Sequence, residues 1–227
     1  MATRFYFNLT TAADVTPPTP LADWEHQETI TTRKMELIAD NSTLTSTAVN
    51  PDGAADLTDK DVLHRQYVSV PIAAQTFTGN VTAQIQVSED NTRNNLFIAV
   101  AIRVISNDGT TVQNESLGVT RSTTTEAGTS PTNMTFPATS IGSYATASGD
   151  RILVELGLGG NAGAASGEHN GTMTWGTNAS GGDLPVDETE TGTTFRGWIE
   201  FSNTLQFVVP KLSGNNFSLL EQRRRRR

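Results

Sequence analysis

The chain of 227 residues has 16 Lys and Arg, 24 Asp and Glu, three His and no Cys, which gives a formal net charge of −8. The absence of Cys excludes disulfide scaffolds, thiol catalysis and Cys-ligated metal centres. The longest apolar run, Leu96 to Ile102, is only seven residues. It is too short to cross a bilayer as a helix, so we expect no membrane partner. The length suits one domain with a substantial core.

The charge is divided unevenly along the sequence. The last five residues are all arginine (Arg223, Arg224, Arg225, Arg226, Arg227). Without them the chain has 11 basic and 24 acidic residues, a charge of −13. An acidic body argues against nucleic acid as a partner. The arginine run is suited to gripping an acidic surface, such as that of another copy, although such a run is also typical of a purification tag or a frayed terminus.

Hydroxyl residues dominate the composition and favour strands. The chain has 35 Thr, 16 Ser, 16 Asn and 19 Gly, and Thr suits strands better than helix interiors. Residues Arg4 to Leu9 alternate apolar and polar side chains, which predicts the first strand. Pro17, Pro18 and Pro20 follow and predict an extended arm. The segment from Leu21 to Glu36 is the one place that suggests a short helical turn, with Asp23 as N-cap and Trp24 as an anchor.

The centre of the chain predicts a run of strands. The residues from Val81 to Ser88 alternate strictly, which indicates one buried and one solvent-facing side. Residues Leu96 to Val104 are apolar on both sides, which indicates a central strand that is covered twice. The turn Asn107-Asp108-Gly109 predicts a hairpin into a return strand. The further strands expected are Val62–Ile72, Val112–Thr120, Met134–Ile141, Arg151–Leu158 (after a turn at Ser148–Asp150), Thr172–Trp175 and a last long strand, Gly197–Val209.

Turn-rich and acidic segments separate these strands. The expected loops are Asn50–Asp61, Arg121–Thr132, Gly159–Gly171 and the acidic Gly181–Gly192. About ten short strands with turn signals between them predict an all-β fold, a single-domain antiparallel β-sandwich of jelly-roll type with extended N- and C-terminal arms. We divide the chain into residues 1–34 (first strand and Pro-rich arm), 35–210 (sandwich) and 211–227 (tail).

The best candidate for catalysis is a pair of strand carboxylates, Glu155 and Glu200. Glycosidases use two carboxylates on facing strands, and Trp175 and Trp198 could supply sugar-stacking platforms. The simpler interpretation is that both glutamates lie on solvent-facing sides of their strands. The sequence has no Gly-x-Ser-x-Gly elbow, and its three histidines form no metal motif. We therefore predict no catalytic residues, no metal site and no cofactor.

Five segments resemble a known group of proteins. They are Arg4–Phe7, Leu63–Thr76, Ile102–Gly109, Gly149–Gly160 and Trp198–Ser202. In this order they resemble uncharacterised β-rich structural proteins encoded by tailed bacteriophages and viral metagenomes. The resemblance implies a component of the virus particle and transfers no catalytic residue. The arginine tail is a departure from the group.

These observations lead to a prediction of a non-enzymatic virion structural protein, either a capsid decoration or a tail-associated subunit, that self-assembles in many copies. The expected partners are other copies and other virion proteins such as the major capsid protein, and the expected location is the virion. The residues expected at assembly contacts are Pro17, Pro18, Pro20, Trp24 and Arg223 to Arg227. A carbohydrate-binding module for host-surface glycans and a self-assembling extracellular filament or coat subunit are the alternatives.

Overall fold

A computed structural model describes residues 1–39, 45–49, 60–92, 95–122, 126–161, 171–175, 182–191 and 195–209. Across these ranges the chain forms eleven strands and no helix. The strands are β1 (Thr3–Ala12), β2 (His26–Glu36), β3 (Thr45–Val49), β4 (Lys60–Val68), β5 (Gln75–Glu89), β6 (Asn95–Ile105), β7 (Val112–Arg121), β8 (Thr132–Thr146), β9 (Arg151–Asn161), β10 (Gly171–Trp175) and β11 (Trp198–Phe201). The arginine tail, the predicted loop residues 50–59 and residues 162–170 lie outside the described ranges.

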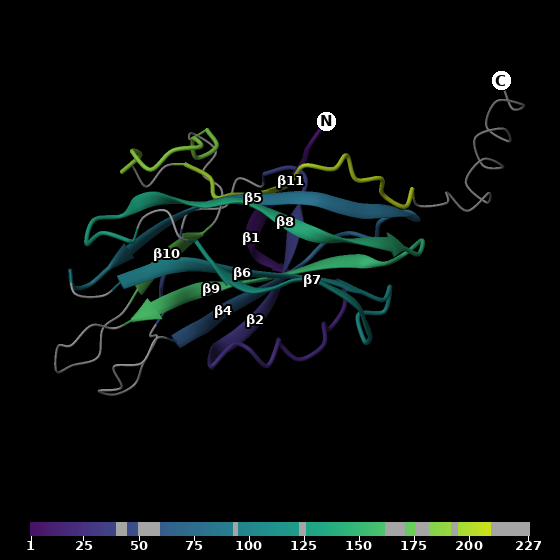
Figure 1. Cartoon of the computed structure of the whole chain (residues 1–227), viewed down its shortest axis with the longest axis horizontal. Coiled ribbons are helices and arrows are strands. Elements are labelled where there is room, and N and C mark those ends of the chain that lie inside the picture. The colour runs from purple at the N-terminus through teal and green to yellow at the C-terminus, as the bar shows by residue number, and fades with distance from the viewer. Residues whose placement is uncertain are drawn as a thin grey trace, which may run out of the picture.

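All eleven strands belong to one hydrogen-bonded sheet. Its order is β3-β10-β5-β11-β1-β2-β4-β9-β6-β7, and β8 pairs with β5. The pairing is antiparallel except between β2 and β4. The sheet folds over on itself, so that β5, β8 and β11 lie in one layer and β2, β4 and β9 lie in the other (Figure 1). The prediction of an all-β antiparallel sandwich is confirmed, with β2–β4 as its one parallel pair among the described strands.

The main core lies between the two layers and follows from the alternation of apolar side chains. It takes Phe5 and Phe7 from β1, the odd-numbered residues Val81 to Val87 from β5, and the even-numbered residues Leu96 to Val104 from β6. Phe5 contacts the ring of Phe201 edge-on at 6.0 Å. Nearly every side chain of β6 is buried, so the prediction of a strand covered on both sides is confirmed.

The outer face of the β4-β9-β6 layer is covered by residues 13–25, which connect β1 to β2. We call these residues the N-terminal strap. Leu21 and Trp24 pack on Leu63, Ala99 and Ala101. Nearer the start of the strap, Ala13 and Val15 pack on a second apolar group that consists of Val68, Ile105 and Leu153. The Pro-rich segment therefore lies across the outer face of its own sheet, and it connects two strands of that sheet, β1 and β2, in sequence.

Two predicted elements are wrong in part. The expected helical turn after Leu21 is a single turn in which the Trp24 amide donates to the Leu21 carbonyl at 3.2 Å. Asp23 is exposed, and the chain from His26 to Glu36 is β2. Pairing with β1 and β4 gives these Thr-rich residues a sheet environment, which outweighs the local helical signal. The last strand is only the four residues of β11, beyond which Phe207 forms one isolated bridge with Ile72.

The expected solvent-facing side of β5 is also wrong, because residues 182–191 cover it. Gln84 is fully buried and Gln86 is 3% exposed. Asn133 of β8 donates to the Pro185 carbonyl at 3.1 Å and accepts from the Glu190 amide at 2.7 Å. The Trp198 indole N–H donates to the Leu184 carbonyl at 2.8 Å. The acidic segment is thus a second strap, whose backbone satisfies polar groups of the sheet.

The remaining predicted strands and turns are present, with boundaries that differ by a few residues. Gly109 in the β6–β7 hairpin has φ +81° and Gly149 before β9 has φ +104°, backbone conformations that glycine adopts readily. β1 pairs with both β2 and β11, so residues 1–34 contribute two interior strands to the sheet. The division of the chain at residues 34 and 210 stays a prediction.

Gly157 of β9 provides a test of the close approach of β9 to the β4 backbone and to the Trp24 ring of the strap. A Cβ there would lie 1.9 Å from the Val62 carbonyl oxygen and 3.0 Å from the Trp24 ring. Gly157→Ala should therefore lower the free energy of unfolding by about 1–3 kcal/mol in denaturant titrations. The matched control is Gly118→Ala on β7, where nothing lies within 4 Å. Equal stability of the two variants would contradict the close packing at Gly157 between β9, β4 and the Trp24 ring.

Candidate functional site: a buried carboxylate beneath the N-terminal strap

The most unusual group in the described chain is the carboxylate of Glu155. It lies on the outer face of β9 and is 0% exposed, because the N-terminal strap covers it. Its cross-strand neighbours are Gln66 on β4 and Ala101 on β6. A carboxylate removed from water is strongly destabilising unless a positive charge and hydrogen bonds compensate it.

The sheet provides the counter-charge and one hydrogen bond. Arg103 of β6, which is 2% exposed, donates from its terminal nitrogen to Glu155 Oε1 in a short ion pair. The amide nitrogen of Gln66 donates to the same oxygen at 2.9 Å. The charge of Glu155 is thus neutralised inside the fold by a partner two strand positions away.

The strap provides the remaining hydrogen bonds. Glu155 Oε2 accepts from the Trp24 indole N–H at 2.8 Å and from the Leu21 amide at 3.2 Å. Arg103 donates to the Thr19 carbonyl at 3.0 Å, and Gln66 donates to the Pro18 carbonyl at 3.2 Å. The polar cluster of Glu155, Arg103 and Gln66 therefore fastens the strap at four points. Both oxygens of Glu155 have protein partners, so the geometry suits anchoring and leaves no accessible face for proton transfer.

The proposed carboxylate pair does not come together. Glu200 lies on β11 and is separated in the sheet from β9 by β1, β2 and β4. It pairs with Arg4 at 3.0 Å, and Arg4 also pairs with Asp183 at 2.8 Å while it stacks over the Trp198 ring at 3.8 Å. The interpretation of Glu155 as a solvent-facing residue is wrong, whereas Glu200 is half-buried.

The candidate assembly residues fall in two places. Trp24 is 4% exposed, and Pro17, Pro18 and Pro20 are half-buried in the strap. Because β1 and β2 hold both ends of the strap in the sheet, exchange of this segment between copies requires β1 to leave the sheet. Arg223 to Arg227 lie outside the described residues. The assembly role of both groups stays a prediction.

The aromatic side chains bear on the glycan alternative. Trp24 and Trp198 are 4% and 1% exposed, and Tyr67 is fully buried. The side chain of Trp175 is outside the described part of the chain. Tyr6 is half-buried and donates to Asp183 at 2.9 Å. Across the described side chains, no Trp is exposed for stacking on a sugar.

Two other titratable groups are perturbed by burial. Burial, with a smaller effect of the nearby Arg65 charge, lowers the pKa of His64 on β4 to about 3, so this histidine is neutral at physiological pH. Burial, together with the charges of Glu126 and Asp90, raises the pKa of Glu89, at the end of β5, to about 7. The described residues contain no group of three or more His, Cys, Asp or Glu that could hold a metal ion.

Comparisons with known proteins give no family. No family model and no curated protein matches the chain. Among solved structures it is similar to an α-amino acid ester hydrolase (8% identity, TM-score 0.40, 90% of this chain and 36% of that one). It is also similar to a CocE/NonD family hydrolase from Staphylococcus aureus (11% identity, TM-score 0.29, 91% of this chain and 34% of that one). A third similar structure is that of the infectious bursal disease virus Gx strain (12% identity, TM-score 0.25, 82% of this chain and 49% of that one). The chain thus spans about a third to a half of those chains, and at these TM-scores the likenesses carry no functional argument.

Among the described residues, no helix is long and apolar enough to cross a membrane.

The anchoring role of Glu155 predicts a large effect of a small change. Glu155→Gln leaves Arg103 as an unpaired buried charge and should lower the free energy of unfolding by about 3–5 kcal/mol. The matched control is Glu200→Gln, because the half-exposed Arg4 keeps Asp183 as its partner; this change should cost about 0–1 kcal/mol. Denaturant titration of both variants is the measurement, and similar losses would contradict the role of the buried pair.

The environment of Glu89 predicts a pH dependence. Its pKa is about 7 in the folded chain against an ordinary value of 4.5, so its ionisation destabilises the fold. The stability contributed by its protonated form is complete below the ordinary pKa and is lost as the pH rises through 7. Glu89→Gln should raise the free energy of unfolding by about 1–2 kcal/mol at about pH 8 and leave it unchanged at about pH 4. An equal effect at both pH values would refute the assignment.

Proposed function

We propose that the chain is a non-enzymatic structural subunit of a virus particle, a capsid decoration or tail-associated protein that assembles in many copies. The single observation that carries the non-enzymatic part is the state of Glu155. The acid that the sequence offers first for catalysis is fully buried and bonded to Arg103, Gln66 and Trp24. A group so enclosed serves to hold the strap, and catalysis would require it to be uncovered.

The position of the resembling segments supports the link to virion proteins. The five segments that resemble phage-encoded structural proteins fall on or at the ends of β1, β4, β6, β9 and β11. These strands, together with β2, are consecutive in the sheet. The segments include Gln66, Arg103 and Glu155. The resembling segments thus fall on a continuous part of the sheet that includes the β4-β9-β6 face under the strap, which is what a shared scaffold predicts.

The surfaces left open support assembly through polar contacts. β7 is the last strand in the sheet order, and β8 pairs only with β5, so each has one edge without a ladder partner among the described strands. Gln113, Glu115 and Gly118 on β7 are exposed, and β8 carries Pro137. Charge and proline on open edges limit unspecific strand pairing. Contacts between copies would then depend on charge, with the basic tail facing an acidic body.

The arginine tail provides the test of assembly. Deletion of Arg223 to Arg227 should shift the purified protein from multimers toward monomers in light scattering at low salt, because the attraction between tail and acidic body is lost. The matched control replaces the five arginines by five serines and should behave like the deletion. Negative-stain images of the parent chain should show regular multimers that dissociate as salt is raised.

Two results would contradict the proposal. One is a parent chain that stays monomeric at all protein and salt concentrations. The other is assembly that is unchanged by removal of the tail across salt concentrations.

A further inference from the structure

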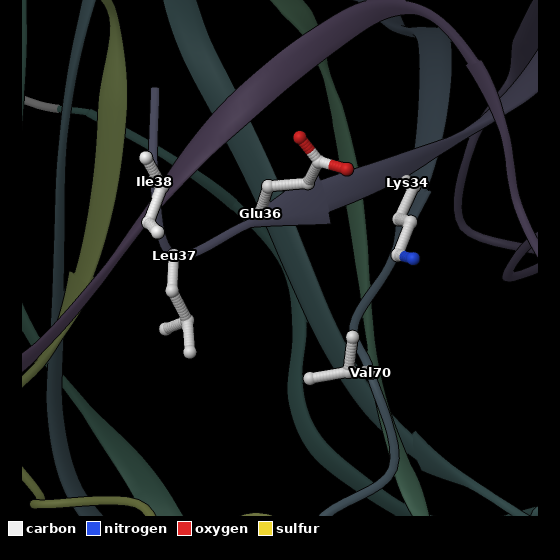
Figure 2. Close-up of a pocket in the computed structure, with 5 residues that line it drawn as sticks. All are labelled: Lys34, Glu36, Leu37, Ile38 and Val70. Carbon is white, nitrogen blue, oxygen red and sulfur yellow. The ribbon is translucent and has the colours of Figure 1, made fainter. Parts of the chain in front are cut away.

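A small apolar pocket opens where two neighbouring strands separate. β2 and β4 pair up to Lys34 and Val68, and then β2 continues beside β1 while residues 70–73 turn toward residues 206–208. The opening has a volume of about 340 Å³ and is lined by Lys34, Glu36, Leu37, Ile38 and Val70. Figure 2 shows Leu37 and Val70 on either side of it, with the Glu36 carboxylate turned away from both.

The apolar residues at this pocket are unusually open to solvent. Ile38 is 81% exposed and Leu37 is 42% exposed. Val208 and Val209 are 39% and 81% exposed, and the Val208 amide donates to the Pro71 carbonyl at 3.0 Å, next to Val70. Four of the six exposed large hydrophobic residues among the described ones therefore lie at or beside this pocket. A concentration of this kind usually marks a surface that something covers.

The two charged side chains at the rim of the pocket already interact with other residues of the chain. Lys34 lies 3.6 Å from Asp14 of the strap, and Glu36 accepts from Asn8 at 3.2 Å. The occupant must therefore make its main contacts with the apolar wall formed by Leu37, Ile38 and Val70.

The sequence beyond Val209 contains a matching segment. The described chain reaches Val209 beside the pocket, and residues 210–216 (PKLSGNN) hold Pro, Gly and Asn, which favour a change of direction. Residues Phe217 to Leu220 (FSLL) then place three apolar side chains within four residues. Seven residues separate Val209 from Phe217, and at about 3.3 Å per residue they allow ample reach for a return to the pocket.

We infer that Phe217 to Leu220 of the same chain dock into the pocket lined by Leu37, Ile38 and Val70. The same chain is favoured over a second copy because the tether between Val209 and Phe217 is short and gives a high effective concentration. Docking also fixes the start of the arginine run three residues beyond Leu220. It thereby presents Arg223 to Arg227 as a localised basic site on an acidic body, suited to an acidic protein surface. This inference concerns the isolated chain and does not depend on the proposed function.

Disulfide trapping tests the inference directly, because the parent chain has no Cys. In dilute oxidised protein, the double variant Ile38→Cys with Leu219→Cys should form an intramolecular disulfide, detected as a monomer whose mass falls by two hydrogens. The matched control pairs Leu219→Cys with Val186→Cys, which is 66% exposed on residues 182–191, and should remain a free dithiol. Disulfide-linked dimers of the first variant would overturn docking within one chain. Absence of the disulfide, or equal formation in both pairs, would overturn the pocket as the docking site.

A second measurement uses the single variant Ile38→Cys and a thiol alkylating reagent. Deletion of residues 217–227 should speed alkylation several-fold, because it uncovers the pocket. Deletion of residues 223–227 alone should leave the rate unchanged. Equal rates in all three chains would also overturn the inference.

Discussion

The need to compensate one buried charge, that of Glu155, determines how the N-terminal strap lies on the sheet. Arg103 neutralises the charge from within the sheet at Glu155 Oε1. The other carboxylate oxygen, Oε2, accepts its hydrogen bonds from Leu21 and Trp24 of the strap. The Thr19 and Pro18 carbonyls of the strap in turn accept hydrogen bonds from the same cluster. Because the strap buries this cluster, each of these hydrogen bonds is needed to keep a buried polar group satisfied once the strap is in place.

The same arrangement recurs on the opposite layer with uncharged groups. Residues 182–191 cover Gln84 and Asn133, and the carbonyls of Pro185 and Leu184 accept from Asn133 and Trp198. In both layers an irregular segment lies on the outer face of the sheet and satisfies its polar groups through its own backbone. With these two segments on its outer faces, the sandwich still leaves β7, β8 and the Leu37–Val70 pocket open to contact.

Strand positions were largely predictable from the sequence, because period-2 alternation reports which side chains share a face. The same signal could not show what covers each face, so Gln84 and Glu155 were both assigned to solvent. Their covers come from residues far away in sequence, 131 positions in the case of Trp24 and Glu155. A usable signal was present, since Glu155 and Arg103 each interrupt an otherwise apolar run, and lone opposite charges in two such runs indicate a buried pair. Trp24 is an anchor within a single turn, as predicted, whereas the residues from His26 onward form β2 because they pair with β1 and β4.

The central claim is that the strap is fixed on the sheet by a bonded, buried Glu155. Hydrogen exchange of the Trp24 indole N–H in solution, followed by NMR, tests it most directly, because this proton is donated to Glu155 at 2.8 Å. The structure predicts that it exchanges as slowly as the backbone amides of β6 and β9, and so opens only with global unfolding. Exchange at the rate of a free indole, while the β6 and β9 amides stay protected, would contradict the account.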